Sequence, residues 1–207
     1  MVHLRRAQYR SMPWRNGMGV TLEIAREPGV GDDFEWRLSL ATVATSGPFS
    51  NYAGYGRSVT LIAGEGFQLG IGDQEPVILD RLAATALFPG NAPTHCTLVN
   101  GPATDLSLMV REPGTIISVS RIHGVAPLTV PLEAEALKAV FCLRNGTRLT
   151  ARNDAVPGSP THAELELVLH DTVLLGRQLS SVSLSPLGDA PADLLLLTWK
   201  AATTERS

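Results

Sequence analysis

Residues 36–57 read WRLSLATVATSGPFSNYAGYGR, and this stretch decides the fold. Its first residues alternate between the two faces of a predicted β-strand, with Trp36, Leu38 and Leu40 on one face and Arg37 and Ser39 on the other. A loop rich in glycine and proline follows the strand and ends at Arg57. The pattern leaves two alternatives open, because Arg37 and Ser39 either line a pocket or face solvent while the apolar residues face the core.

Turn residues recur at short intervals along the whole chain, because 19 glycines and 14 prolines divide the 207 residues into short runs. Short apolar runs between turn residues are typical of an all-β sandwich or barrel. One segment, residues 131–140, has apolar residues at helical spacing and acidic residues in its first turn, so it predicts a short helix. Asn145-Gly146 lies between two apolar runs and predicts a hairpin.

The best internal boundary lies at Gly114, because each side holds enough short strands for a small barrel or sandwich. We therefore predict two β halves that pack together: residues 1–113, which carry the predicted pocket, and residues 114–200. Residues 201–207 are predicted to form a tail.

Composition argues against several classes of function. The formal net charge is −3 and the lysines do not cluster, so the sequence does not predict a nucleic-acid or membrane-surface protein. The first residues, MVHLRRAQYRSM, lack the apolar core of a signal peptide, and the two cysteines, Cys96 and Cys142, have no CxxC spacing. We expect a cytoplasmic protein with idle thiols.

A polar cluster and a single acidic residue outside the opening stretch are candidates for a site. Residues 12–17 read MPWRNG, where Trp14 offers an aromatic wall and Asn16 offers both a donor and an acceptor. The alternative is that this loop caps the barrel and that Trp14 only fills the core. Asp105 begins another predicted strand, where it is either an acid that partners Arg37 or Arg57, or an ordinary capping residue.

A further candidate cluster contains His95, which follows the turn FPG at residues 88–90. A proline-glycine turn before a histidine and a strand resembles the second motif of cupin barrels, in which that histidine binds a metal. The first cupin motif would supply further histidines upstream, but residues 54–70 contain none. One histidine does not complete a site with three or four ligands, so we expect neither a metal nor another cofactor.

Five segments together resemble the HutD/Ves family: MPWRNG (12–17), WRLSLA (36–41), GPFS (47–50), FPG (88–90) and DLSLM (105–109). The resemblance implies an all-β, cupin-like bicupin with two RmlC-like jelly-roll barrels, the first of which carries the pocket. It also implies an association with histidine utilisation, in which members resemble small-molecule binding or regulatory proteins. Met18 and Ser107 depart from the family pattern, which has glycine and asparagine there, and both could change the pocket.

We expect the pocket to bind a small carboxylate without a metal, and the binding to sense or buffer a metabolite. Arginine forks match carboxylates bidentately, and serine hydroxyls and aromatic rings would hold the rest of the ligand. The predicted ligand-binding residues are Trp14, Asn16, Arg37, Ser39, Phe49, Ser50, Arg57, His95 and Asp105.

Two other functions stay open at this point. One is a metal-independent isomerase or lyase, with His95 as general base and Asp105 as the residue that orients it. The other is a structural or protein-interaction module. The ligand and the oligomeric state are not fixed by the sequence, although exposed sheet edges make a homodimer a reasonable hypothesis.

Overall fold

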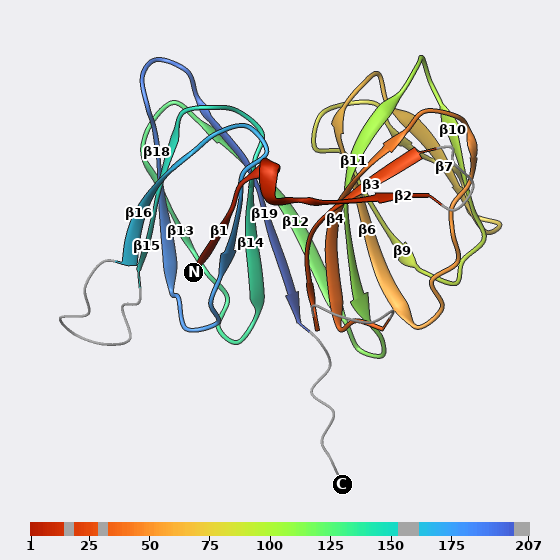
Figure 1. The fold of residues 1–207 in the computed structure, drawn as a ribbon, viewed down its shortest axis with the longest axis horizontal. Helices are drawn as coiled ribbons and strands as arrows, with labels where there is room; N and C mark the ends of the chain where they lie inside the picture. Colours follow the sequence, from red (N-terminus) through yellow and green to blue (C-terminus); the bar gives the residue numbers. More distant parts are fainter. Residues whose placement is uncertain (15–18, 29–32, 153–161, 201–207) are drawn as a thin grey trace, which may run out of the picture. The chain divides into compact units, whose positions relative to one another are not determined.

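The computed structural model describes residues 1–14, 19–28, 33–152 and 162–200, and it consists almost entirely of β-strands (Figure 1). The one helix in these ranges is a 3₁₀ turn, η1 (Arg6–Gln8). No helix in the described part of the chain has the length and apolar character needed to cross a membrane. The chain divides into two compact units, which are described separately below.

The unit formed by Tyr9–Ile117 contains two antiparallel sheets. The larger sheet has the order β2 (Arg10–Pro13), β3 (Gly19–Glu27), β4 (Trp36–Val43), β11 (Ala103–Arg111), β6 (Tyr55–Ala63) and β9 (Thr85–Pro89). The smaller sheet has the order β5 (Gly47–Pro48), β10 (Thr94–Leu98), β7 (Phe67–Ile71) and β8 (Val77–Leu79).

The other unit combines Met1–Gln8 with Ser118–Lys200 and also contains two sheets. The first has the order β1 (Val2–Leu4), β17 (Thr172–Leu175), β14 (Leu137–Cys142), β19 (Ala192–Lys200) and β12 (Ile116–Gly124). The second has the order β13 (Leu128–Pro131), β18 (Ser181–Pro186), β15 (Thr147–Arg152) and β16 (His162–Leu167).

Each unit has its own apolar core, made by alternate residues of its strands. In the unit Tyr9–Ile117 the core includes Val59 and Leu61 of the larger sheet and Phe67, Leu69 and Cys96 of the smaller one. Burial of such side chains supplies the main driving force for folding. The two cysteines, Cys96 and Cys142, are both free and buried, and burial raises the pKa of each thiol to about 11.

The predicted helix at residues 131–140 is wrong. Pro131 ends β13, Glu135 adopts a positive φ of 61° in the turn that follows, and β14 then pairs with both β17 and β19. Sheet pairing on two sides outweighs the weak helical pattern of a short segment.

The Asn145-Gly146 turn exists, but it does not close a hairpin. It joins β14 to β15, and these strands belong to different sheets. Gly146 has a φ of 88°, and the Asn145 side-chain oxygen accepts a hydrogen bond of 2.6 Å from the backbone N–H of Leu169. The sequence signal therefore identified the turn correctly but not the strands that it connects.

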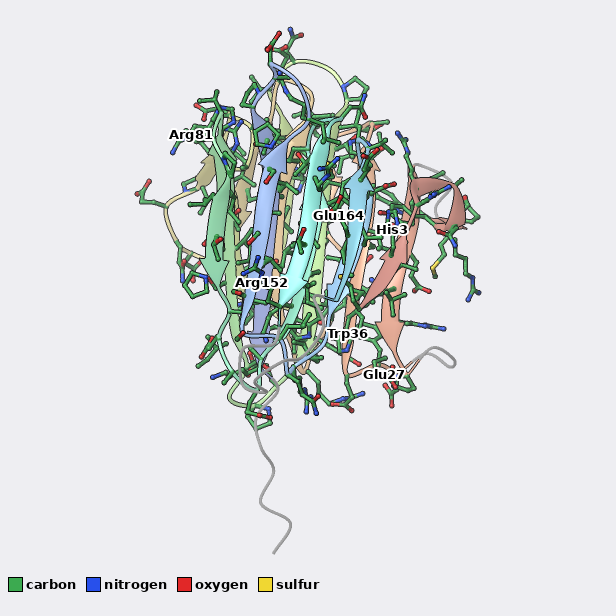
Figure 2. All side chains as sticks on the ribbon, turned by 90° about the vertical axis from the view of Figure 1, so that its left-hand side faces the viewer. His3, Glu27, Trp36, Arg81, Arg152 and Glu164 are labelled. Carbon is green, nitrogen blue, oxygen red and sulfur yellow. The ribbon has the colours of Figure 1, made fainter. Side chains whose placement is uncertain are left out.

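The N-terminal strand β1 is fixed beside β17 by a contact between two side chains as well as by backbone pairing. His3 Nε2 lies 2.8 Å from Asp171 Oδ2, and Asp171 is only 2% exposed. The backbone N–H of Val168 donates a second hydrogen bond of 3.3 Å to the same oxygen. Figure 2 labels His3 on β1 and Glu164 on β16, where Glu164 forms an exposed ion pair with Arg148.

Replacing His3 by alanine should destabilise the protein. The change leaves the Asp171 carboxylate buried with one fewer partner, which costs about 1–3 kcal/mol. Arg148→Ala is the control, because exposed ion pairs contribute less than about 1 kcal/mol. Urea unfolding followed by circular dichroism measures both free energies. Equal losses of unfolding free energy in the two variants would show that the His3–Asp171 contact stabilises the protein no more than the exposed ion pairs of Arg148.

Candidate functional site

Three adjacent strands of the larger sheet bring the predicted arginines to one face. Arg37 of β4 lies opposite Met109 of β11, and Met109 lies opposite Arg57 of β6. Residues directly opposite each other in antiparallel strands share a face. Val59 of the apolar core lies two positions after Arg57 on β6, so both arginines are on the interior face.

The apolar residues of β4 lie on the opposite face of the sheet, and they are buried as well: Trp36, Leu38 and Leu40. Burial on both faces explains why the alternation alone could not decide which side holds the pocket chemistry. The structure places the Arg37 and Ser39 side of β4 toward the core between the two sheets.

Arg37 is surrounded by aromatic and sulfur groups. Its Nη2 donates to Tyr52 Oη at 3.1 Å and to Met109 Sδ at 3.5 Å. Its guanidinium carbon lies 5.0 Å from the centroid of the Phe34 ring and 5.1 Å from that of Tyr52. Contacts at this distance stabilise the cation, and more strongly where water is excluded.

Arg57 is enclosed more completely, with 6% of its surface exposed. Its guanidinium carbon lies 5.4 Å from the ring centroids of Phe49 and Tyr52 and 5.1 Å from that of Phe88. Its Nη1 donates to the backbone carbonyl of Ser50 at 3.1 Å. Phe49 and Ser50, two of the predicted ligand-binding residues, therefore both contact Arg57, Phe49 through its ring and Ser50 through its backbone.

The loop that carries Tyr52 is fixed by a close backbone contact with Gly90. Gly90 donates to the carbonyl of Tyr55, and its own carbonyl accepts a hydrogen bond of 2.8 Å from the N–H of Tyr52. A Cβ atom at position 90 would lie 2.2 Å from the carbonyl oxygen of Tyr52. Only glycine fits there, which gives the FPG segment a physical role in placing the Tyr52 ring between the two arginines.

Asp105 is the carboxyl group whose charge acts on Arg57. It is 2% exposed on the same face of β11 as Met109, and burial raises its pKa to about 7 although the charge of Arg57 opposes that rise. Burial also lowers the pKa of Arg57 to about 10, so this guanidinium stays charged at neutral pH. We call the set Arg37, Arg57, Tyr52, Met109 and Asp105 the arginine cluster.

The positive charge of the arginine cluster is not neutralised by an ion pair. Within the described ranges, neither Arg37 nor Arg57 forms a salt bridge with a carboxylate, and the Nε atom of each is buried without a hydrogen-bond partner. At neutral pH Asp105 is only partly ionised, so it compensates the charge of Arg57 incompletely.

The remaining predicted residues divide into three groups. Trp14 packs against the same apolar core and donates from Nε1 to Thr21 Oγ1 at 2.9 Å, and Ser39 is buried on the interior face. Asn16 lies outside the described residues. His95 is exposed on the face of β10 opposite to buried Cys96, so the structure does not bring it to Asp105.

The sequence analysis missed several residues that complete the site. Tyr52 and Phe34 lie in loops, where no periodic pattern marks the direction of a side chain. Glu23 is 7% exposed and lies opposite Ser39, but an irregularity between Glu23 and Ala25 breaks the alternation of β3 that would have indicated its face. In the described part of the chain, no three His, Cys, Asp or Glu side chains gather in a way that could hold a metal ion.

Related proteins agree with this architecture. The chain is 42% identical over 107 residues to an uncharacterized 21.2 kDa protein from the hutC 3′ region of Pseudomonas putida, an alignment that covers 51% of this chain and 56% of that protein. The chain thus matches little more than half the length of this curated relative. A crystal structure of a conserved protein of unknown function from Pseudomonas aeruginosa has a TM-score of 0.82 and 29% identity, and covers 96% of this chain and 98% of that one.

Two further structures connect the chain to a family and to a fold. HutD from Pseudomonas fluorescens has a TM-score of 0.74 and 27% identity over 96% of this chain and 97% of its own. Oxalate decarboxylase from Lactobacillus farciminis, at 8% identity and a TM-score of 0.71 over 96% and 86%, shares only the cupin-like fold. The predicted all-β bicupin class is thereby confirmed. Because the family model of HutD matches residues 6–189, the chain belongs to the HutD family.

Proposed function

We propose that this protein binds a small carboxylate metabolite at the arginine cluster. The observation that carries the proposal is a buried arginine, Arg57, beside a partly buried one, Arg37: neither forms a salt bridge with a carboxylate in the described residues, and the Nε atom of each is buried without a hydrogen-bond partner. A buried charge is costly unless it is paired, and a bound carboxylate would provide that pairing through two parallel N–H···O bonds. The unpaired cations would then be a preformed anion site.

The surroundings of the arginines suit a small, partly apolar acid. Phe49, Phe88 and Tyr52 present their ring faces to Arg57, and Trp14 packs on the adjoining core. Mostly apolar walls with a few fixed polar groups are typical of small-molecule sites. No described acid–base pair accompanies the arginines, so we favour binding that senses or buffers a cytoplasmic metabolite over catalysis.

Family membership narrows the class of acid. The Pseudomonas putida relative is named for its position beside hutC, and the Pseudomonas fluorescens HutD structure was obtained in a formate condition. Formate is the smallest carboxylate. We therefore propose acids of histidine breakdown as ligands, with urocanate, formiminoglutamate and formylglutamate as the candidates.

Neutralising either arginine should weaken binding of all three acids. A charge-assisted hydrogen bond contributes about 1.5–3 kcal/mol, so Arg57→Gln and Arg37→Gln should each raise Kd by about 10- to 100-fold. Isothermal titration calorimetry measures the change. Arg81→Gln is the matched control, because Arg81 belongs to the same unit but its side chain is 84% exposed.

Binding of none of the acids to the unaltered protein would contradict the proposal. Unchanged affinity in both variants, with circular dichroism spectra like those of the unaltered protein, would contradict it equally. A loss of affinity in Arg81→Gln as large as in Arg57→Gln would point to a general charge effect instead of the arginine cluster.

Affinity should fall as the pH rises from 6 to 8. Protonated Asp105 does not repel a bound anion, whereas ionised Asp105 does, so binding favours the protonated carboxyl group. With a pKa of about 7, the ionised fraction grows through this range while Arg57 stays charged. If the ligand binds only the form with protonated Asp105, Kd rises at most about tenfold between pH 6 and pH 8.

Formylglutamate is the ligand for this measurement, since its carboxyl groups do not titrate above pH 6. Asp105→Asn should bind with nearly constant affinity over the same range. A pH dependence that persists unchanged in Asp105→Asn would assign the titration to another group.

A further inference from the structure

A second group of buried polar atoms adjoins the arginine cluster on the same face of the sheet. Glu23 of β3 lies opposite Ser39 of β4, and Ser39 lies opposite Ser107 of β11. Residues at these positions share a face, which is the interior one. We call Glu23, Ser39 and Ser107 the acidic row.

The acidic row has unused hydrogen-bonding capacity. Glu23 is 7% exposed and Ser107 is 5% exposed. Glu23 Oε2 and Ser107 Oγ are both buried without a hydrogen-bond partner among the described residues. Buried polar atoms are nearly always paired, so two unpaired oxygens on the strands that flank β4 indicate a position where a ligand group completes them.

Arg26 contacts only one of the two oxygens of the Glu23 carboxylate. Arg26 Nε lies 3.6 Å from Glu23 Oε1, and both side chains are largely buried. This contact leaves Oε2 available, and a carboxylate oxygen accepts hydrogen bonds but does not donate them. A group that satisfies Oε2 must therefore bring a hydrogen to it.

The acidic row lies within reach of a small molecule held by Arg37. Glu23 is on the strand next to Arg37 and is displaced along it by two pairing positions. Diagonal neighbours of this kind have Cβ atoms about 7 Å apart. An acid whose carboxylate meets the arginines could place a second polar group at Glu23 a few bonds away.

We propose that the acidic row binds an N–H group of the ligand, so that the preferred ligand is a carboxylate with a nitrogen donor at its other end. Glu23 Oε2 accepts the N–H hydrogen bond. The hydroxyls of Ser107 and Ser39 can rotate to donate or accept a hydrogen bond with the adjoining ligand atoms. This inference rests on the proposed function, because the arginine cluster must first hold the carboxylate.

A matched pair of acids tests the inference. Urocanate carries an imidazole N–H, whereas 3-(2-furyl)acrylate has the same acrylate chain on a ring that lacks any N–H. The unaltered protein should bind urocanate at least tenfold more tightly. Glu23→Gln should weaken urocanate at least tenfold and Ser107→Ala about threefold, while both variants bind furylacrylate within twofold of the unaltered protein. Glu65→Gln, a change at an exposed carboxylate of the same unit, is the control.

Each contrary outcome has a distinct meaning. Equal affinity of the unaltered protein for the two acids overturns the inference but leaves the proposed function intact, provided that Arg57→Gln weakens both. Equal weakening of both acids by Glu23→Gln also overturns it, because Glu23 would then act only by positioning Arg26. If Glu23→Gln lowers Tm sharply, the affinities of Ser107→Ala for urocanate and furylacrylate are compared instead. Equal weakening of both acids in Ser107→Ala then overturns the inference. If neither acid binds the unaltered protein, the proposed function fails and the inference fails with it.

Discussion

The placement of two arginines on the interior face of one sheet, with Met109 between them, is the constraint on which the rest of the site depends. The register of β4, β11 and β6 aligns Arg37, Met109 and Arg57 in one row, which directs both arginine side chains to the interior face. A one-residue slip would move all three side chains to the opposite face of the sheet. The sheet thus fixes the charges, and the aromatic rings and the Tyr52 hydroxyl partly replace the water that they have lost.

This arrangement also explains why the nearby acid is poorly ionised. Asp105 lies in the same dry interior as Arg57, yet burial raises its pKa more than the positive charge lowers it. A fully ionised Asp105 would satisfy the arginines internally and reduce their attraction for an external anion. Arg57 consequently keeps its charge at neutral pH without full compensation by Asp105, which is unusual for a buried group and is consistent with a role in binding.

The alternation of β4 predicted which residues share a face, and the structure places Phe49 and Phe88, from the segments 47–50 and 88–90, against Arg57. Other features depend on long-range contacts that a local pattern does not contain. Both faces of the sheet are buried, so hydrophobicity could not assign the interior side to Arg37, and the irregularity in β3 hid Glu23. The pairing of β1 with β17 joins residues at opposite ends of the sequence, and the strand at Leu137–Cys142 forms because of its two neighbours despite a helical pattern.

The two buried thiols have a practical consequence for solution experiments. With a pKa of about 11, Cys96 and Cys142 each hold roughly three thiolates per ten thousand molecules at pH 7.5, against about one in ten for an ordinary exposed cysteine. Maleimide and iodoacetamide dyes react with the thiolate, and both sulfur atoms are also shielded from reagents. A single cysteine introduced on an exposed loop could therefore be labelled with a fluorophore while both native cysteines stay in place, which keeps the core around the arginines unaltered during spectroscopic work.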